Sequence, residues 1–126
     1  EYARQKAQLY ADELARKVEF EGNLKLIKLT ECDEPSLLRD AANYLQKRET
    51  QTALVAAYKV DGKPQLALMY TSDLVQSGKN AGKDIRVAAK FIAGGGGGQP
   101  GFATAGGKDI DGLANAFEAL VKAAKS

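Results

Sequence analysis

The 126-residue chain has no histidine and no tryptophan, and its single cysteine is Cys32. Without histidine it lacks the commonest general base and the commonest metal-ligating side chain. One cysteine can form neither an internal disulfide nor a cysteine-rich zinc site, so Cys32 is expected as a small, partly buried apolar side chain near a strand end. The carboxylates are scattered, with no pair at a spacing that demands acid–base catalysis. We therefore predict no catalytic residues and no metal site in this chain.

Long hydrophobic runs are also missing, since no stretch approaches the roughly 18 apolar residues of a membrane span. The first residues do not have the charged, apolar and small-residue regions of a secretory signal. Hydrophobic residues make up 44% of the chain and charged residues 27%, which is typical of a globular domain. The expectation is one compact, soluble, cytoplasmic domain with no membrane partner.

The chain begins inside a helical pattern. Apolar residues recur at spacings of four, three, four and four, which predicts one apolar stripe on a helix that ends at Gly22-Asn23: Ala3, Ala7, Tyr10, Leu14 and Val18. Such a stripe must face the rest of the domain, a neighbouring domain or a second copy of the chain in a homodimer.

Strand and helix signals then alternate. Residues 24–30 read as a strand, and Asp33-Glu34-Pro35 is a helix-start signature, with Asp33 or Ser36 as the cap of a helix that reaches Arg48. Residues 52–60 and 64–72 flank Asp61-Gly62-Lys63, which is a strong hairpin signal. The strands of this hairpin are apolar enough to be covered on one face or on both.

A looser segment over 73–80 leads to a helix over 81–93, with Gly94 placed as its C-terminal cap. A final amphipathic helix starts at about Asp109. Between these helices lies a glycine segment, expected as a loop that can include a strand. The alternation predicts an α/β fold with a mixed β-sheet packed with helices and preceded by the N-terminal helix.

Glycine is concentrated in one place, because eight of the 13 glycines lie between Gly94 and Gly107. The segment is either a flexible linker or an ordered element whose bare backbone approaches a ligand or another backbone, with amides that converge on an anion. Pro100 and Phe102 within it favour order. A Walker loop is excluded because Gln99-Pro100 follows the glycine run. A dinucleotide fingerprint is excluded because no strand precedes the run.

Positive charge gathers around the glycines. Residues 78–108 contain five basic side chains against one acidic side chain, Asp84. Lys83, Arg86 and Lys90 are three and four residues apart, which places them on one helix face away from Ile85. A basic face beside a glycine segment suits a phosphate backbone, although a plain solvated face would look the same.

Residues 90–107, KFIAGGGGGQPGFATAGG, resemble the glycine signature of the DHH-associated domain, in particular the version that forms the C-terminal domain of alanyl-tRNA synthetase. Gly94–Gly98 match the glycine run of that family, Pro100 its proline, Ala103 its first alanine, and residues 105–107 its closing residues. Gln99 stands where the family usually has arginine or lysine. The related DHH phosphoesterases often end the run in histidine, which is absent here.

The resemblance implies a non-catalytic domain that holds the outer corner of alanine tRNA, so that the acceptor end visits the aminoacylation and editing sites of the parent ligase. It implies residues 1–21 as the end of a helical subdomain and 22–126 as the globular domain. ATP, Mg and Zn would belong to the rest of the parent. Together with the positive charge counted above, this leads us to predict the following RNA-binding residues: Gly94, Gly95, Gly96, Gly97, Gly98, Gln99, Pro100, Gly106, Gly107, Lys79, Lys83, Arg86, Lys90 and Lys108.

Two alternatives remain. One is a substrate clamp of a DHH phosphoesterase that acts on single-stranded nucleic acid, and the other is a dimerisation module that uses the N-terminal stripe. Phe102 is expected mainly in the core, and Tyr58 and Tyr70 as sheet residues rather than RNA-stacking platforms.

Overall fold

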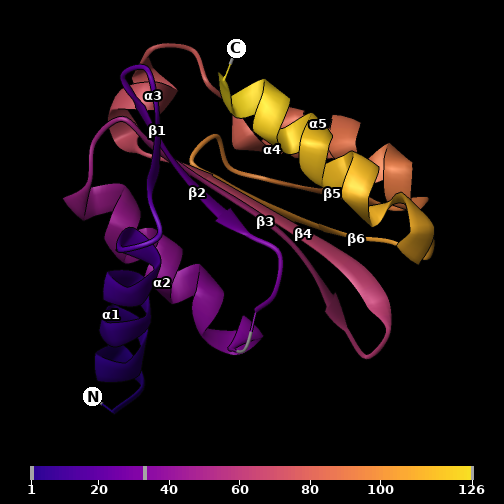
Figure 1. Cartoon of the computed structure of the whole chain (residues 1–126), viewed down its shortest axis with the longest axis horizontal. Coiled ribbons are helices and arrows are strands. Elements are labelled where there is room, and N and C mark those ends of the chain that lie inside the picture. Colours follow the sequence, from indigo (N-terminus) through magenta and orange to yellow (C-terminus); the bar gives the residue numbers. More distant parts are fainter. Residues whose placement is uncertain (1, 33, 126) are drawn as a thin grey trace.

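A mixed six-stranded β-sheet forms the centre of the molecule (Figure 1). Its strands are β1 (Glu19–Glu21), β2 (Leu24–Leu29), β3 (Thr52–Val60), β4 (Lys63–Tyr70), β5 (Gly95–Gly98) and β6 (Phe102–Gly106). They lie in the order β1–β2–β3–β4–β6–β5, with β2 and β3 parallel and all other neighbours antiparallel. The computed structural model describes residues 2–32 and 34–125, without the side chains of residues 2 and 3. The expected α/β fold with a mixed sheet is confirmed.

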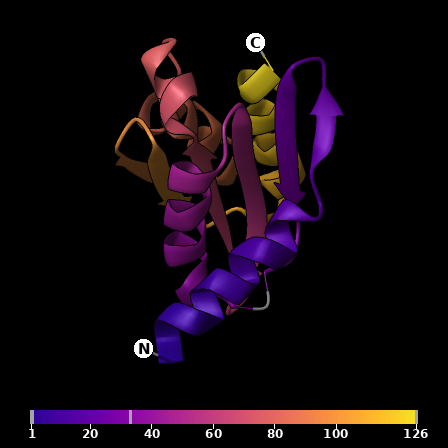
Figure 2. The same cartoon turned by 90° about the vertical axis from the view of Figure 1, so that its left-hand side faces the viewer.

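Helices cover both faces of this sheet. They are α1 (Tyr2–Ala15), α2 (Pro35–Arg48), α3 (Ser72–Gln76), α4 (Ala81–Ala89) and α5 (Leu113–Lys125), with short 3-10 turns at Lys90–Ile92 and Ile110–Gly112. In Figure 1, α1 and α2 lie on one side of the sheet and α4 and α5 on the other, and Figure 2 looks onto the sheet from the side of α1 and α2. In the described part of the chain no helix combines the length and apolarity that a membrane span needs.

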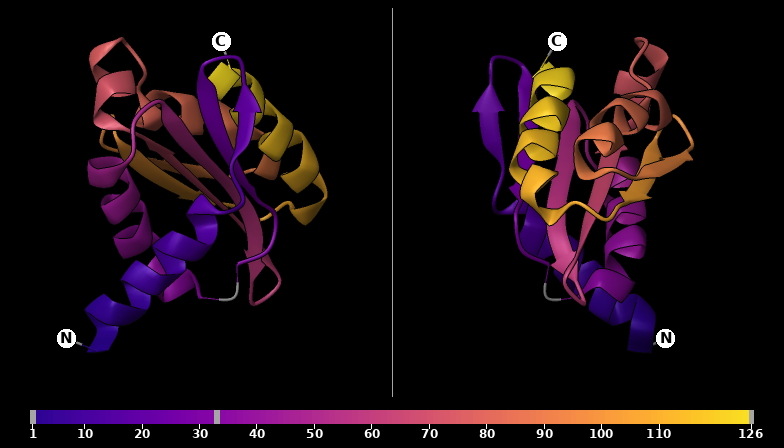
Figure 3. Two further views of the ribbon diagram at one scale, coloured as in Figure 1. Left: turned by 60° about the vertical axis from the view of Figure 1, so that its left-hand side comes forward. Right: turned by 90° about the vertical axis from the view of Figure 1, so that its right-hand side faces the viewer.

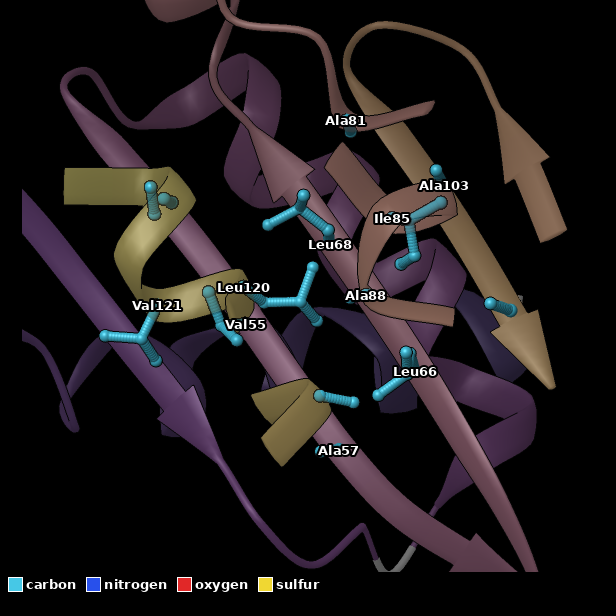
Figure 4. Packing of buried hydrophobic residues seen from close by; sticks show 14 of the residues in the cluster. Val55, Ala57, Leu66, Leu68, Ala81, Ile85, Ala88, Ala103, Leu120 and Val121 are labelled. Carbon is cyan, nitrogen blue, oxygen red and sulfur yellow. The ribbon is translucent and has the colours of Figure 1, made fainter. Parts of the chain in front are cut away.

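The side chains on the two faces of the β3–β4 hairpin belong to two separate hydrophobic cores. Val55, Leu66 and Leu68 point toward α4 and α5, where they meet Ile85 and Leu120 (Figure 4). The alternate residues of the same strands pack against α1 and α2. Because both faces are buried, β3 and β4 are apolar along most of their length, as the sequence predicted.

The apolar stripe of the N-terminal helix faces the rest of the domain. Ala7 and Leu14 are fully buried, and Tyr10 is 9% exposed in the core beneath α1 and α2. The hydroxyl of Tyr10 lies 3.2 Å from the Sγ of Cys32, which is half-buried just after β2 as expected. The side chain of Ala3 lies outside the described ones.

The predicted end of that helix is wrong. α1 ends at Ala15, and β1 follows as a short strand paired with β2. Gly22, with a φ of 64°, forms the turn between these two strands instead of a helix end. The strand escaped detection because three residues are too few to show an alternation pattern.

Other boundaries follow the sequence with local corrections. Asp61 and Gly62 both have positive φ, which confirms the hairpin between β3 and β4. The segment expected to be loose contains α3. The cap of α2 is Glu34, which makes no side-chain capping bond, so Ser36 is not the cap, and Asp33 lies outside the described residues.

The C-terminal end of α4 also differs from the prediction. α4 ends at Ala89, and the left-handed residue after the following 3-10 turn is Ala93, with a φ of 52°, not Gly94. Gly94 is required for another reason. A Cβ built on it would lie 2.0 Å from the carbonyl oxygen of Gly106, so only glycine allows the two backbones to approach this closely.

Candidate nucleic-acid interface

The glycine run forms β5, an edge strand paired with β6, rather than a loop (Figure 3). Glycine is required at alternate positions of this strand. A Cβ on Gly96 would lie 2.2 Å from the carbonyl oxygen of Thr104, and one on Gly98 would lie 2.5 Å from that of Phe102. The backbones of β5 and β6 are therefore closer than side chains permit, which explains why the chain accepts the entropic cost of these glycines.

The other glycines of the strand are not needed for this packing. A Cβ on Gly95 would meet nothing within 4 Å, and one on Gly97 would only touch the Nε of Arg86 at 3.9 Å. Neither residue has a positive φ. Their lack of side chains leaves the surface of β5 bare, which is compatible with the close approach of a ligand.

The hydrogen bonds of the run leave two amides directed outward. Gln99 and Phe102 exchange both backbone bonds, at 2.9 and 3.3 Å, and Gly94 donates to the carbonyl of Ala89 at 3.0 Å. Bonded and non-bonded pairs alternate along an antiparallel ladder, so Gly97 and Gly95 also pair with β6. The N–H groups of Gly96 and Gly98 then point away from β6, toward the open edge.

The closing glycines donate within the protein. The amide of Gly107 donates to the carbonyl of Pro64 at 3.2 Å, and that of Lys108 donates to the carbonyl of Ile92 at 2.9 Å. Gly106 lies in β6 between β4 and β5. Gly106 therefore lies inside the sheet and Gly107 directly after β6, and their amides are directed within the protein.

The turn between β5 and β6 is fixed from three sides. The carbonyl of Pro100 accepts a hydrogen bond from the amide of Ala81, and the carbonyl of Gly101 accepts one from the amide of Tyr70. Gly101 is buried against the side-chain amide of Gln46, which would have to move to admit a Cβ. Gln99 and Pro100 themselves are exposed. The turn thus presents Gln99 from a rigid support.

Helix α4 brings its basic face to this strand through another close contact. A Cβ on Gly82 would lie 2.8 Å from the carbonyl oxygen of Gly98, so glycine allows α4 to lie against β5. One turn later the Nε of Arg86 donates to the carbonyl of Gly82 at 3.1 Å, which holds this side chain beside Gly97. Lys83 and Lys90 are exposed on the same helix and its 3-10 extension.

Lys79 and Asp84 are directed elsewhere. The Nζ of Lys79 donates to the carbonyl of Ala123 at 2.8 Å and lies 5.8 Å from the ring centroid of Tyr70. The hydroxyl of Tyr70 donates to Asp84 at 2.6 Å, and burial together with this carboxylate raises the pKa of Tyr70. The carboxylate of Asp84 therefore accepts a hydrogen bond from a buried tyrosine of the sheet.

Shallow clefts lie at both ends of the glycine strand. One, of about 440 Å³, is lined by Lys63, Gln65, Lys108 and the glycines at residues 94–95 and 106–107. The other, of about 260 Å³, lies between α2 and the hairpin formed by β5 and β6, and it includes Arg39. Lys63, Gln65 and Arg39 were missed because they come from other elements, and no linear pattern connects them to the glycines.

The aromatic residues lie as expected. Tyr58 and Tyr70 are sheet residues, 8% and 0% exposed. Phe102 packs against the core beneath α2 but is only partly buried, and it lines the smaller cleft.

Within residues 2–32 and 34–125, no group of three or more cysteine, aspartate or glutamate side chains is arranged to hold a metal ion.

Comparisons with known proteins agree with the glycine signature. The model of the DHHA1 domain family matches residues 26–126. The alanine–tRNA ligase of Parabacteroides distasonis is 36% identical over 124 residues, which cover 98% of this chain and 14% of that protein. The chain thus spans about one-seventh of the length of this relative.

Solved structures give the same grouping. The crystal structure of the C-Ala domain from Aquifex aeolicus alanyl-tRNA synthetase matches with a TM-score of 0.72 and 28% identity, covering 87% of this chain and 99% of that one. A pGpG-specific phosphodiesterase from Vibrio cholerae matches with a TM-score of 0.56 and 16% identity, covering 98% of this chain and 40% of that one. The second likeness concerns the fold alone.

Proposed function

The chain belongs to the DHHA1 domain family, and from this premise we propose that it is the tRNA-binding C-terminal domain of an alanine–tRNA ligase. The length of its relatives supports a division of labour in which aminoacylation, editing and the ATP, Mg and Zn that serve them belong to the other domains of the parent. The role of this domain is to hold the outer corner of alanine tRNA in the cytoplasm, so that the acceptor end reaches both reaction sites.

The observation on which this proposal rests is the bare edge strand beside a basic helix face. The outward amides of Gly96 and Gly98 are donors that an RNA phosphate or base edge can reach without obstruction by a Cβ. Lys83, Arg86 and Lys90 supply the positive charge along α4. Contacts of this kind position an RNA backbone and depend on salt.

The remaining predicted residues divide by position. Gln99 and Pro100 project from the turn at one end of β5, and Lys108 lines the cleft at the other end. Lys79 contributes long-range charge only, because its ammonium donates to the end of α5. Residues 1–21 remain proposed as the end of a helical subdomain, although α1 packs on the same core as α2.

The two alternatives have less support. The phosphodiesterase likeness is one of fold and does not identify a substrate. Dimerisation through the apolar stripe would require α1 to leave the core in which Ala7 and Leu14 are buried.

A salt titration of the affinity of this chain for alanine tRNA tests the proposal. We expect a log–log slope of about −2 to −4, as three or four phosphate contacts would give. A tRNA whose elbow pairing is disrupted, and the variant Gly97→Val, should both bind at least tenfold more weakly, because valine fills the open space above β5. Phe20→Val is the matched control, since Phe20 is 69% exposed on the opposite edge strand.

Circular dichroism should show that Gly97→Val keeps the fold. Equal and weak binding to all RNAs, unchanged by Gly97→Val, would contradict the proposal and leave the glycine segment with a structural role only.

A further inference from the structure

The cleft between α2 and the β5–β6 hairpin has a more apolar lining than the basic face of α4. We call it the α2–hairpin groove. It has a volume of about 260 Å³, and it is lined by Pro35, Leu38 and Arg39 of α2, Tyr58 of β3, and residues 97–99 and 102–104 of the hairpin. Among these described lining residues, Arg39 is the single charged one.

The walls of the groove combine three kinds of surface. Leu38 and Phe102 give it an apolar side, and Phe102 remains partly open because only part of its ring packs into the core. Gly97 and Gly98 give a bare backbone side. Gln99 stands at the mouth on the rigid turn, and Arg39 is exposed on the first turns of α2.

This combination indicates a base together with its phosphate rather than a phosphate alone. A bare anion site has no use for an aromatic wall, whereas unstacked RNA bases pack on aromatic rings and hydrogen-bond through their edges. Pockets that enclose drug-sized ligands have volumes of about 300–1,000 Å³, so a smaller groove suits a single base. Among the described lining residues Arg39 has no acidic neighbour, and its positive charge complements a phosphodiester.

We infer that the α2–hairpin groove takes one unstacked nucleotide of single-stranded RNA. The base lies against Phe102, the side-chain amide of Gln99 hydrogen-bonds its edge, and the guanidinium of Arg39 binds its phosphate. This inference rests on the proposed function and extends it, because the nucleotide is held on the α2 side of the hairpin, away from the basic face of α4.

The test uses the ¹⁵N-labelled 126-residue chain and nucleoside 5′-monophosphates, with ribose 5-phosphate as the probe that has no base. The amides of residues 97–99 and 102–104 should shift with the nucleotides and much less with ribose 5-phosphate at equal concentration. Arg39→Ala and Phe102→Leu should each weaken nucleotide binding about tenfold, a typical effect of losing one stacking or charge-assisted contact.

Matched variants separate the contributions. Arg39→Lys keeps the charge and should recover part of the affinity, whereas Arg16→Ala removes another exposed arginine, in the turn that follows α1, and should change nothing. The tRNA affinity of Arg39→Ala is measured beside these titrations and should fall by a similar factor. The surface position of Arg39 makes its variants safe for the fold even if Phe102→Leu loosens the core.

Three results would overturn the inference. Equal shifts with ribose 5-phosphate would indicate an anion site without base recognition. Shifts confined to α4, or an unchanged tRNA affinity in Arg39→Ala, would show that RNA binds without this groove, and the proposed function would stand. Absence of any tRNA binding by the wild-type chain would contradict the proposed function as well.

Discussion

The two edges of the sheet are built in opposite ways. At one edge, β1 is three residues long and bears Glu19 and Glu21, which pair with Lys28 at 3.6 Å and Lys125 at 2.7 Å. At the other edge, β5 is four glycines without a single side chain. Figure 3 shows both strands at the margins of the same sheet.

The difference shows how one sheet edge is protected from pairing with another chain while the other edge stays accessible to a ligand. Short length and charged side chains are ordinary means of preventing an edge strand from pairing with another chain, and β1 uses both. β5 is also short, with four residues, but it has no charged side chain, and glycine has a poor intrinsic preference for strands. It is held as a strand by β6, by the close contact of Gly82 and by the fixed turn, and this support leaves its outer backbone open.

The largest effect is expected from adding one methyl group to the inner side of β5. Gly96→Ala would place a Cβ 2.2 Å from the Thr104 carbonyl, and we expect it to lower the free energy of unfolding by about 1–3 kcal/mol, as overpacking does. Gly97→Ala, whose Cβ would meet only Arg86 at 3.9 Å, should change stability far less. Urea unfolding of both variants measures the difference. Equal destabilisation would show that the two kinds of glycine are not distinct.

A smaller effect is expected from reversing one charge near each edge. Lys83→Glu, on the helix beside β5, should weaken binding of alanine tRNA about tenfold and make the salt slope shallower by about one or more. Lys17→Glu, an exposed position just before β1, has the same change in net charge and should have little effect. Filter binding at several salt concentrations compares them. Equal losses would mean that tRNA responds to net charge and not to the β5 edge.

The smallest effect concerns the ion pair at the β1 edge. The hydrogen bond and the charge of Lys125 hold the pKa of Glu21 below its usual value, near 4.5. Because the pKa is lowered in the folded state, this pair stabilises the protein above that value, and the contribution is lost as the pH falls through the lowered pKa.

In Lys125→Met, NMR titration should show the pKa of Glu21 moving upward. Thermal unfolding at neutral pH should hardly change, since exposed ion pairs contribute little. A large fall in the melting temperature would show that the β1 edge depends on this ion pair for its stability, and it would contradict the prediction that the pair contributes little.

Most of the central fold could be read from local patterns. Asp61-Gly62 between two apolar runs predicted the hairpin, because a two-residue turn with positive φ is fixed by those residues themselves. The stripe on α1 predicted a buried helix face. Boundaries failed where the deciding contact was remote, as at Gly94, whose neighbour is Gly106.

The candidate site was predicted only in part. The glycine run and the basic face of α4 are contiguous in sequence, so their association could be seen without a structure. Arg39 and Lys63 could not be found in this way, because they reach the β5–β6 hairpin from α2 and β4, which are distant in sequence. For Lys79 the sequence and the structure differ in the opposite way. Its position in the sequence, close to α4, predicts a place in the site, but its ammonium donates to the carbonyl of Ala123 in α5.

By itself the sequence determined the class of fold, the family signature and the region of positive charge, since each depends on residue type and spacing along the chain. Only the tertiary structure decided that the glycines form an edge strand, which of them must lack a Cβ, and which two amides face outward. Because glycine has no side chain, its residue type does not indicate which segment it packs against. Its conformation is set by the backbones that approach it.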